Sequence, residues 1–220
     1  RAGERLSLVG PSGGGKSTIA SLLPRFWDVK DGSILLRGKD IREIPLASLM
    51  DNISMVFQRV YLFQDTVYNN IAMGRTDATE DEVYEAAKKA RCYDFIMALP
   101  EGFQTVIGEG GASLSGGEMQ RISIARIFLK NPPILIFEEA PASVYADNES
   151  QIQAAISELV QGKTLLVIAH RLHTIAKADQ ILVISDGRIA EQGSHETLIA
   201  ANGLYHNMVK KRASVTGFQK

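Results

Sequence analysis

The stretch that decides the fold runs from Gly10 to Ser17 and reads G-P-S-G-G-G-K-S. A short strand pattern, Arg5 to Val9, leads into it, and a helical pattern from about Lys16 to Leu23 follows and ends before Pro24. Strand, glycine-rich turn and helix in this order are typical of a P-loop, whose glycines let backbone N–H groups turn inward around phosphate oxygens. The spacing therefore predicts a nucleoside-triphosphate site.

Within this loop we expect Lys16 to reach the β- and γ-phosphates and Ser17 to bind Mg²⁺. The alternative, a glycine-rich structural turn, is disfavoured by the complete motif and by the elements on both sides. The loop does not by itself separate ATP from GTP. The residues that we expect to contact nucleotide are Gly10, Pro11, Ser12, Gly13, Gly14, Gly15, Lys16, Ser17 and Thr18.

Strand and helix patterns alternate beyond the loop, which predicts an α/β fold with a mostly parallel sheet. The apolar run from Ile134 to Phe137 is typical of a central strand covered on both faces. Asp186-Gly187 lies between two strand patterns and indicates a hairpin. The other expected elements are strands at Ser33–Arg37, Ile53–Phe57, Thr164–Ile168, Ile181–Ile184 and Arg188–Gln192, and a helix from about Asn148 to Val160.

The middle of the chain has a different pattern of apolar and polar residues. Asp81–Ala90 and Ile122–Leu129 have helical periodicity, and the two prolines after Asn131 end this region. We therefore expect a mostly helical insertion in the α/β core. The expected segments are a first part of the core at 1–65, a helical subdomain at 66–132, a second part of the core at 133–209 and a frayed polar tail at 210–220.

Composition excludes several classes of protein. The 220 residues carry a formal net charge of -1, so no electrostatic footprint for nucleic acid is present. The single cysteine, Cys92, excludes an internal disulfide and a multi-cysteine metal site. The apolar runs are too short to span a bilayer. The chain starts at Arg1 without a signal peptide, and we expect it to be part of a longer protein.

A second motif, L-S-G-G-E-M-Q-R at Leu114–Arg121, is similar to the signature of ABC ATPases, which usually reads L-S-G-G-Q. Gln58 in V-F-Q-R resembles the family's Q-loop, and His170 in V-I-A-H-R-L resembles its switch histidine. Gly108–Gly111 and Ala178–Leu198 are similar to exporter-type members. The matches follow the family's order over almost the whole chain. The chain thus resembles the ATP-binding domain of an exporter-type ABC transporter, which implies a P-loop NTPase (RecA-like) core with an inserted helical subdomain.

The resemblance implies Mg²⁺ and ATP as ligands, and a head-to-tail dimer with a second ATP-binding domain, identical or different. Each nucleotide would lie between the glycine-rich loop of one subunit and the signature of the other. A loop of small residues ahead of a helix is a second phosphate-binding N-terminus, although it also fits a helix-capping turn. The expected signature contacts are Ser115, Gly116, Gly117 and Glu118.

The resemblance also assigns the residues that act on the phosphates. Glu139 would polarise the attacking water, and His170 would bond to the γ-phosphate or to that water. Gln58, Glu138 and Ser17 would hold the magnesium ion. The alternatives are a solvated strand-end charge for Glu139, a partly buried histidine and a turn glutamine. As partners the resemblance implies transmembrane domains, at the cytoplasmic face of a membrane (the inner membrane in a bacterium).

The sequence departs from the family at three positions. Glu138 replaces an aspartate, Pro141 follows Ala140 where threonine is usual, and Tyr145 replaces the aspartate that ends the D-loop. We expect these changes to slow turnover and to spare nucleotide binding. The aromatic residue that stacks on adenine in the family is absent from the nine residues before Gly10, so we expect it upstream.

Two other functions stay open at this point. One is a degenerate nucleotide-binding module that gates without hydrolysis, which the departures favour. The other is a soluble ABC ATPase of DNA repair or translation, which the charge balance does not support. The transported substrate is not encoded in these motifs.

Overall fold

The structure is a computed structural model that describes residues 2–56, 60–108, 111–138, 149–169 and 175–216. It divides into two compact units, and each is described by itself. The first unit comprises Arg1–Met55, Pro133–Glu139 and Lys163–Lys220. The second comprises Val56–Pro132 and Ala140–Gly162.

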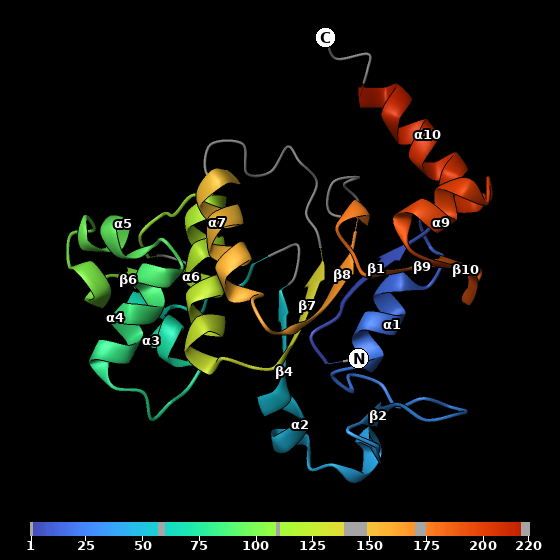
Figure 1. Cartoon of the computed structure of the whole chain (residues 1–220). Helices are drawn as coiled ribbons and strands as arrows, with labels where there is room; N and C mark the ends of the chain where they lie inside the picture. Colours follow the sequence, from blue (N-terminus) through green and yellow to red (C-terminus); the bar gives the residue numbers. More distant parts are fainter. Residues whose placement is uncertain (1, 57–59, 109–110, 139–148, 170–174, 217–220) are drawn as a thin grey trace. The chain divides into compact units, whose positions relative to one another are not determined.

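A six-stranded sheet with the order β10-β9-β1-β8-β7-β4 forms the centre of the first unit (Figure 1). β1 pairs in parallel with both β8 and β9, and β7 pairs in parallel with β8. Among the described pairings within this six-stranded sheet, only that of β9 with β10 is antiparallel. The strands are β1 (Arg5–Val9), β4 (Ile53–Val56), β7 (Ile134–Glu138), β8 (Thr164–Ile168), β9 (Gln180–Ser185) and β10 (Arg188–Gly193).

A small hairpin and the helices named below also belong to the described part of the first unit. The hairpin pairs β2 (Leu35–Leu36) with β3 (Lys39–Asp40) outside the large sheet. The helices are α1 (Lys16–Leu22), the 3₁₀ helix η1 (Ile41–Glu43), α2 (Leu46–Asn52), α9 (His195–Ala200) and α10 (Leu204–Thr216).

The core of the first unit consists of aliphatic side chains from the parallel strands and from the elements packed on them. Burial of this surface is the main driving force that holds the strands in register, at about 25 cal/mol per Å² of apolar area. The buried cluster is Leu8, Ala20, Ile41, Leu49, Ile53, Ile136, Leu166, Ile168 and Ile184.

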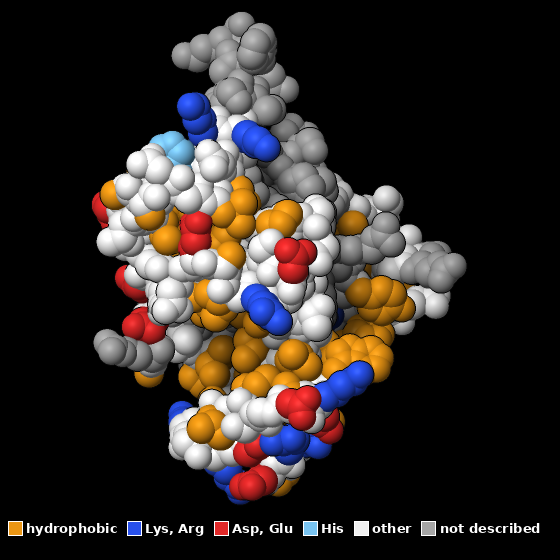
Figure 2. Space-filling view, turned by 90° about the vertical axis from the view of Figure 1, so that its right-hand side faces the viewer, with side chains coloured by type: hydrophobic (Ala, Val, Ile, Leu, Met, Phe, Trp, Pro, Cys, Tyr) orange, Lys and Arg blue, Asp and Glu red, His pale blue; other side chains and the backbone are white. Residues whose placement is uncertain are grey.

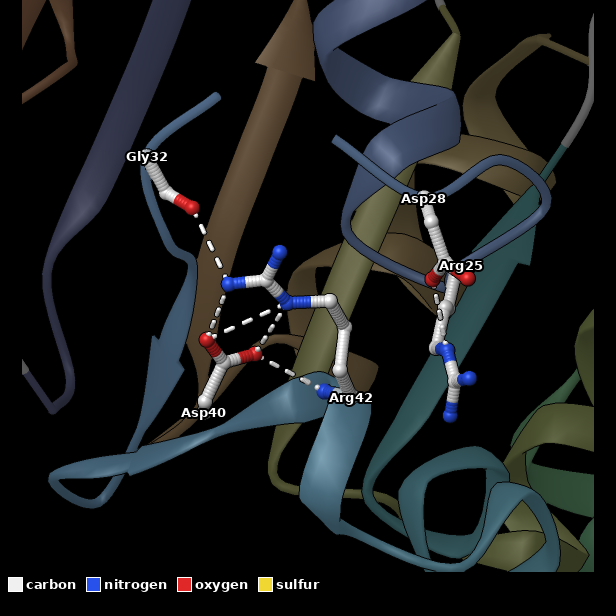
Figure 3. A network of polar contacts seen from close by, with 5 residues as sticks. All are labelled: Arg25, Asp28, Gly32, Asp40 and Arg42. Carbon is white, nitrogen blue, oxygen red and sulfur yellow. Dashed lines mark hydrogen bonds and ion pairs between the residues drawn. The ribbon is translucent and has the colours of Figure 1, made fainter. Parts of the chain in front are cut away.

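An ion pair holds the segment around β3 and η1 (Figure 3). The Asp40 carboxylate caps η1 by accepting from the Arg42 backbone N–H at 2.9 Å. The Arg42 guanidinium bonds both Asp40 oxygens and donates to the Gly32 carbonyl at 3.0 Å. These hydrogen bonds from Arg42 lower the pKa of Asp40. The contact is solvent-exposed, so it fixes local geometry more than it adds stability.

The second unit is mostly helical, as expected. α4 and α3 pack on α6, and a Thr79–Glu82 capping box starts α4. Buried Asn70 bonds the backbone of Phe63 and Thr66, which ties the chain before α3 to the helix. The elements are β5 (Asp65–Thr66), α3 (Val67–Ala72), α4 (Glu80–Lys89), α5 (Tyr93–Met97), η2 (Gly102–Gln104), β6 (Val106–Ile107), α6 (Gly116–Lys130) and α7 (Glu149–Leu159).

The structure confirms the predicted α/β class with a mostly parallel sheet, and β8 has the predicted bounds. Three local predictions were wrong. The strand predicted at Ser33–Arg37 is confined to Leu35–Leu36, and it pairs with β3 outside the large sheet. The helix expected from Ile122 begins at Gly116, because the Ser115 cap offsets the poor helix propensity of the glycines. The described part of the expected frayed tail, residues 210–216, belongs to α10, which continues to Thr216.

The expected segment bounds and the compact units differ at α7. The sequence assigned residues 133–209 to the core, whereas α7 groups with the second unit, where it packs on α6. The division of the chain by function into core and helical subdomain stays a prediction.

Hydrophobic side chains gather on the face shown in Figure 2, next to a region where both signs of charge alternate. In the segment between α1 and β2, Phe26 and Trp27 are 50% and 71% exposed. Within the described ranges, no helix combines the length and the apolar character that crossing a membrane requires.

We predict that Ile136→Ala lowers the free energy of unfolding by about 2–5 kcal/mol, because it leaves a cavity in the buried core of the first unit. Ile136 is fully buried, whereas Ile189 on edge strand β10 is 54% exposed. Chemical denaturation checks this, with Ile189→Ala as the matched control that should change stability little. Equal losses for both variants would contradict the described core.

Candidate functional site

The site begins where three parallel strands end side by side. Ile168 of β8 is in register with both Leu8 of β1 and Glu138 of β7. The Ala169 N–H then donates to the Leu8 carbonyl at 3.1 Å, which extends the alignment past the strand end. Glu138, Ile168 and Ala169 therefore lie with the end of β1 at one edge of the sheet, and this edge is the usual ligand site of open α/β sheets.

The glycine-rich loop leaves β1 at this edge and curls before α1. Gly13 and Gly15 have φ values of 76° and 105°, which L side chains rarely adopt. A Cβ built at Gly10 would overlap the backbone oxygen of Ile184, so the loop approaches β9 too closely for any side chain. This cradle suits a triphosphate, because it presents backbone rather than side chains to the ligand.

Lys16 lies inside the curve of this loop and is only 7% exposed. Its ammonium donates to the carbonyl oxygens of Gly10 at 3.1 Å and Pro11 at 2.7 Å. These neutral acceptors satisfy a charge that burial would otherwise penalise. Phosphate oxygens would be stronger acceptors for the same ammonium, because the hydrogen bond would then join two charged groups.

Ser17 and Glu138 supply oxygen atoms next to Lys16. The Ser17 hydroxyl donates to Glu138 Oε1 at 3.5 Å, and Ser17 is exposed at the start of α1. Hydroxyl and carboxylate oxygens are ligands that Mg²⁺ accepts, usually together with water and substrate phosphates. The pair therefore fits a magnesium ion, and it joins two residues that the sequence assigned to metal.

The signature residues lie in the second unit, at the start of α6. Ser115 is the N-cap, and Gly116 and Gly117 are the first helical residues, not a loop ahead of the helix. The Ser115 hydroxyl accepts from the Glu118 N–H at 3.3 Å, and the Ser115 N–H donates to the Glu118 carboxylate at 2.8 Å. The helix-capping turn, which the sequence left open as the alternative, is thus present. An anion at this end of α6 would meet the positive end of the helix dipole and also the Glu118 charge.

Several predicted residues lie outside the part of the chain that the structure describes. These are Gln58, Glu139, His170, Pro141 and Tyr145. Their roles stay predictions. Of the predicted nucleotide and metal residues that are described, Gly10–Thr18 and Glu138 come together in the first unit, and Ser115–Glu118 form one group in the second.

The sequence reading missed the turn that supports the glycine-rich loop. The Gly187 N–H, between β9 and β10, donates to the Gly14 carbonyl at 3.0 Å. The D-G pair signalled only a hairpin, because a contact with a segment so distant in the chain leaves no local pattern.

Cys92 takes no part in the described site. It is fully buried in the second unit, and burial raises the pKa of its thiol to about 12. At neutral pH the thiolate, which is the nucleophilic form, is therefore almost absent.

The comparisons with known proteins identify the family and the fold. A sequence model described as ABC transporter matches residues 1–142. An ATP-dependent lipid A-core flippase of Syntrophus aciditrophicus is 54% identical over 208 residues, which are 94% of this chain and 35% of that protein. Proteins of Staphylococcus aureus that carry names of multidrug export ATP-binding/permease proteins are 52% identical over 206 residues, 94% of this chain and 36% of theirs.

A solved structure of a bacterial Atm1-family ABC exporter with ATP bound superposes with a TM-score of 0.87. Its sequence is 48% identical, and the match covers 96% of this chain and 37% of that one. The chain belongs to the ABC transporter family, and its fold is that of the family's ATP-binding domains. It spans about a third of the length of the curated relatives it matches.

We predict that Lys16→Ala weakens Mg-ATP binding by about 100-fold, as the loss of two charge-assisted hydrogen bonds of roughly 1.4 kcal/mol each would do. Titration calorimetry of the folded variant measures this. Lys39→Ala removes the same charge from the exposed strand β3 and should bind normally. Unchanged affinity in Lys16→Ala would remove the lysine from the phosphate site.

Proposed function

We propose that this chain is the ATP-binding and ATP-hydrolysing domain of an exporter-type ABC membrane transporter, working as a head-to-tail dimer that powers substrate translocation. The observation that carries the proposal is the meeting of the glycine-rich loop, the enclosed Lys16 ammonium and the Ser17–Glu138 oxygen pair at one edge of the parallel sheet. Relatives named as exporters and as a flippase support it.

In this proposal the backbone of Gly10–Thr18 binds the triphosphate, and Lys16 turns from the Gly10 and Pro11 carbonyls to the β- and γ-phosphates. Ser17, Glu138 and Gln58 hold the magnesium ion. Mg²⁺ when bound neutralises charge on the β- and γ-phosphate oxygens. Ser17 and Glu138 fit this task because their oxygens already lie side by side.

Glu139 and His170 act on the attacking water in the same proposal. Glu139 directly follows β7, and His170 follows Ala169, which extends the neighbouring strand β8. A carboxylate at such a strand end can orient water or accept its proton, and an imidazole can bond to the γ-phosphate. The register of β7 with β8 supports placing both residues at the edge that carries the glycine-rich loop.

The partner in the proposed dimer is a second ATP-binding domain, identical or different. Ser115, Gly116, Gly117 and Glu118 would bind the γ-phosphate held by the partner's glycine-rich loop. The start of α6 supports this because the dipole of a 15-residue helix favours an anion there. The negative charge of Glu118 would repel a phosphate at this site, but the Glu118 carboxylate is hydrogen-bonded to the Ser115 N–H.

Transmembrane domains are the other proposed partners, at the cytoplasmic face of the membrane. The relatives are about three times as long as the segment they share with this chain, which leaves room for such domains. Their printed names differ in what is moved: lipid A-core in one and drugs in others. We therefore propose no transported substrate.

One observation favours the second candidate, a nucleotide-binding module that hydrolyses slowly. Glu138 is one methylene longer than the aspartate of the family, and its contact with Ser17 is long, at 3.5 Å. Because magnesium demands near-octahedral geometry, a displaced carboxylate would displace the metal's water shell. Glu139 is nevertheless present after β7, so we place hydrolysis first and expect it to be slow.

We predict that Glu139→Gln binds ATP but does not hydrolyse it, so that a closed dimer accumulates. Light scattering at high protein concentration should show doubling of the mass on addition of Mg-ATP. A variant that hydrolyses at the original rate would remove Glu139 from its proposed role.

Adding Ser115→Arg to Glu139→Gln should abolish that dimer, because bulk and charge enter the proposed trans-phosphate site. Thr79→Arg removes a capping box of the same kind from α4 and serves as the matched control. A Ser115→Arg double variant that still dimerises with ATP would contradict the head-to-tail arrangement.

We predict that Glu138→Asp with Tyr145→Asp raises the hydrolysis rate at saturating ATP by about tenfold, which corresponds to roughly 1.4 kcal/mol of barrier. The shorter carboxylate restores the metal position, and misplacement near 1 Å can cost about 100-fold. ATP affinity should change little, since neither residue belongs to the glycine-rich loop. Phosphate release at equal dimer occupancy is the measurement, and equal rates would show that the site tolerates both departures.

A further inference from the structure

The turn between β9 and β10 touches the back of the glycine-rich loop. Asp186 and Gly187 both have left-handed backbone angles, with φ values of 50° and 71°. Ser185 and Arg188 pair on either side of them, so the two residues form the tip of a tight hairpin. Such a turn is rigid and strongly favours Gly at its second position.

The hairpin and the end of β9 lie against Gly14 and Gly15 of the loop. The Gly187 N–H donates to the Gly14 carbonyl at 3.0 Å. A Cβ at Gly14 would lie 2.8 Å from the Ile184 carbonyl oxygen, and one at Gly15 would lie 3.5 Å from the Gly187 Cα. Ile184 is itself fully buried in the core of the first unit. The loop thus rests on a surface that the core holds in place.

We propose that Gly187 is a positioning residue for nucleotide binding: its turn fixes the peptide between Gly14 and Gly15 in the orientation that binds phosphate. The peptide unit is planar and trans, so its C=O and N–H point in opposite directions. Because the Gly14 carbonyl is bonded to Gly187, the Gly15 N–H points away from the hairpin. This inference rests on the proposed ATP-binding function.

The consequence is preorganisation of the phosphate site. Without the Gly187 contact, the peptide between Gly14 and Gly15 could rotate, because glycines on both sides allow many backbone angles. Nucleotide would then have to order this peptide on binding, at the expense of affinity. The turn acts through the loop and does not touch the reacting atoms, so the step after binding should be affected far less.

The chain contains a matched hairpin for a control. Arg37 and Gly38 join β2 to β3 with φ values of 52° and 81°, and Leu36 pairs with Lys39 on either side. A Cβ at Gly38 or at Gly187 meets no described atom within 4 Å. Alanine therefore causes the same backbone strain in both turns, but only one of them supports the phosphate loop.

The experiment compares Gly187→Ala with Gly38→Ala in the full chain by calorimetric titration with Mg-ATP. We expect Gly187→Ala to weaken binding about tenfold, equivalent to roughly 1.4 kcal/mol, and Gly38→Ala to bind like the parent. In steady-state hydrolysis, Gly187→Ala should raise KM with kcat within about twofold, as loss of uniform binding does. Equal losses of affinity in both variants, or none in either, would overturn the inference.

The parent chain separates this inference from the function on which it rests. If the parent chain binds no Mg-ATP, the proposed function is wrong. If the parent binds Mg-ATP and Gly187→Ala binds it with the same affinity, only the proposed role of the turn is wrong. If Gly187→Ala does not fold, Asp186→Ala is the milder variant and Arg37→Ala its control, since alanine tolerates positive φ less well than aspartate. Binding by Asp186→Ala should fall about threefold relative to Arg37→Ala, and equal affinities would overturn the inference.

Discussion

The parallel register of β1, β8 and β7 is the constraint on which the rest of the site depends. Ile168 lies beside both Leu8 and Glu138, so the chain leaves all three strands at the same edge of the sheet. Buried aliphatic side chains such as Ile136 and Leu166 pack on these strands and stabilise the alignment. Burial in the core thereby sets the distance between Ser17 and Glu138. When the packed core fixes the geometry of a site, its polar groups can be exposed to solvent and still keep a fixed distance from one another.

The electrostatics of the glycine-rich loop follow from that placement. Lys16 is buried as a cation, which is costly unless its N–H groups find acceptors. Two carbonyls of the loop supply them at 3.1 and 2.7 Å. The same loop is held from behind by the Gly187 N–H and by contact with the Ile184 backbone. The inner side of the loop therefore bonds to the Lys16 ammonium, which phosphate can attract. Its outer side bonds to Gly187 and lies against the backbone of buried Ile184.

Local sequence patterns predicted those elements in which the types of residue match the observed burial of the element. β8 has the predicted bounds, and the hairpin at Asp186-Gly187 was visible from its turn residues. Ser33–Arg37 was misread because its apolar residues pack from a separate short hairpin, which a local apolar pattern cannot distinguish from a sheet strand. The start of α6 was placed too late, since Gly116 and Gly117 disfavour helix while the Ser115–Glu118 capping box favours it. Of the candidate site, the loop and the Ser17–Glu138 pair could be predicted by motif, and their contact distances could not.

The sequence by itself determined the α/β class, the phosphate loop and the membership of the ABC transporter family, because each depends on residue types at short, fixed spacings. Only the tertiary structure decided what supports that loop. Gly14 and Gly187 are far apart in the chain, and they meet because β9 pairs with β1 in the sheet. The order of strands in a sheet is chosen by how the whole set of apolar faces can be buried together, and no local stretch of sequence contains that information.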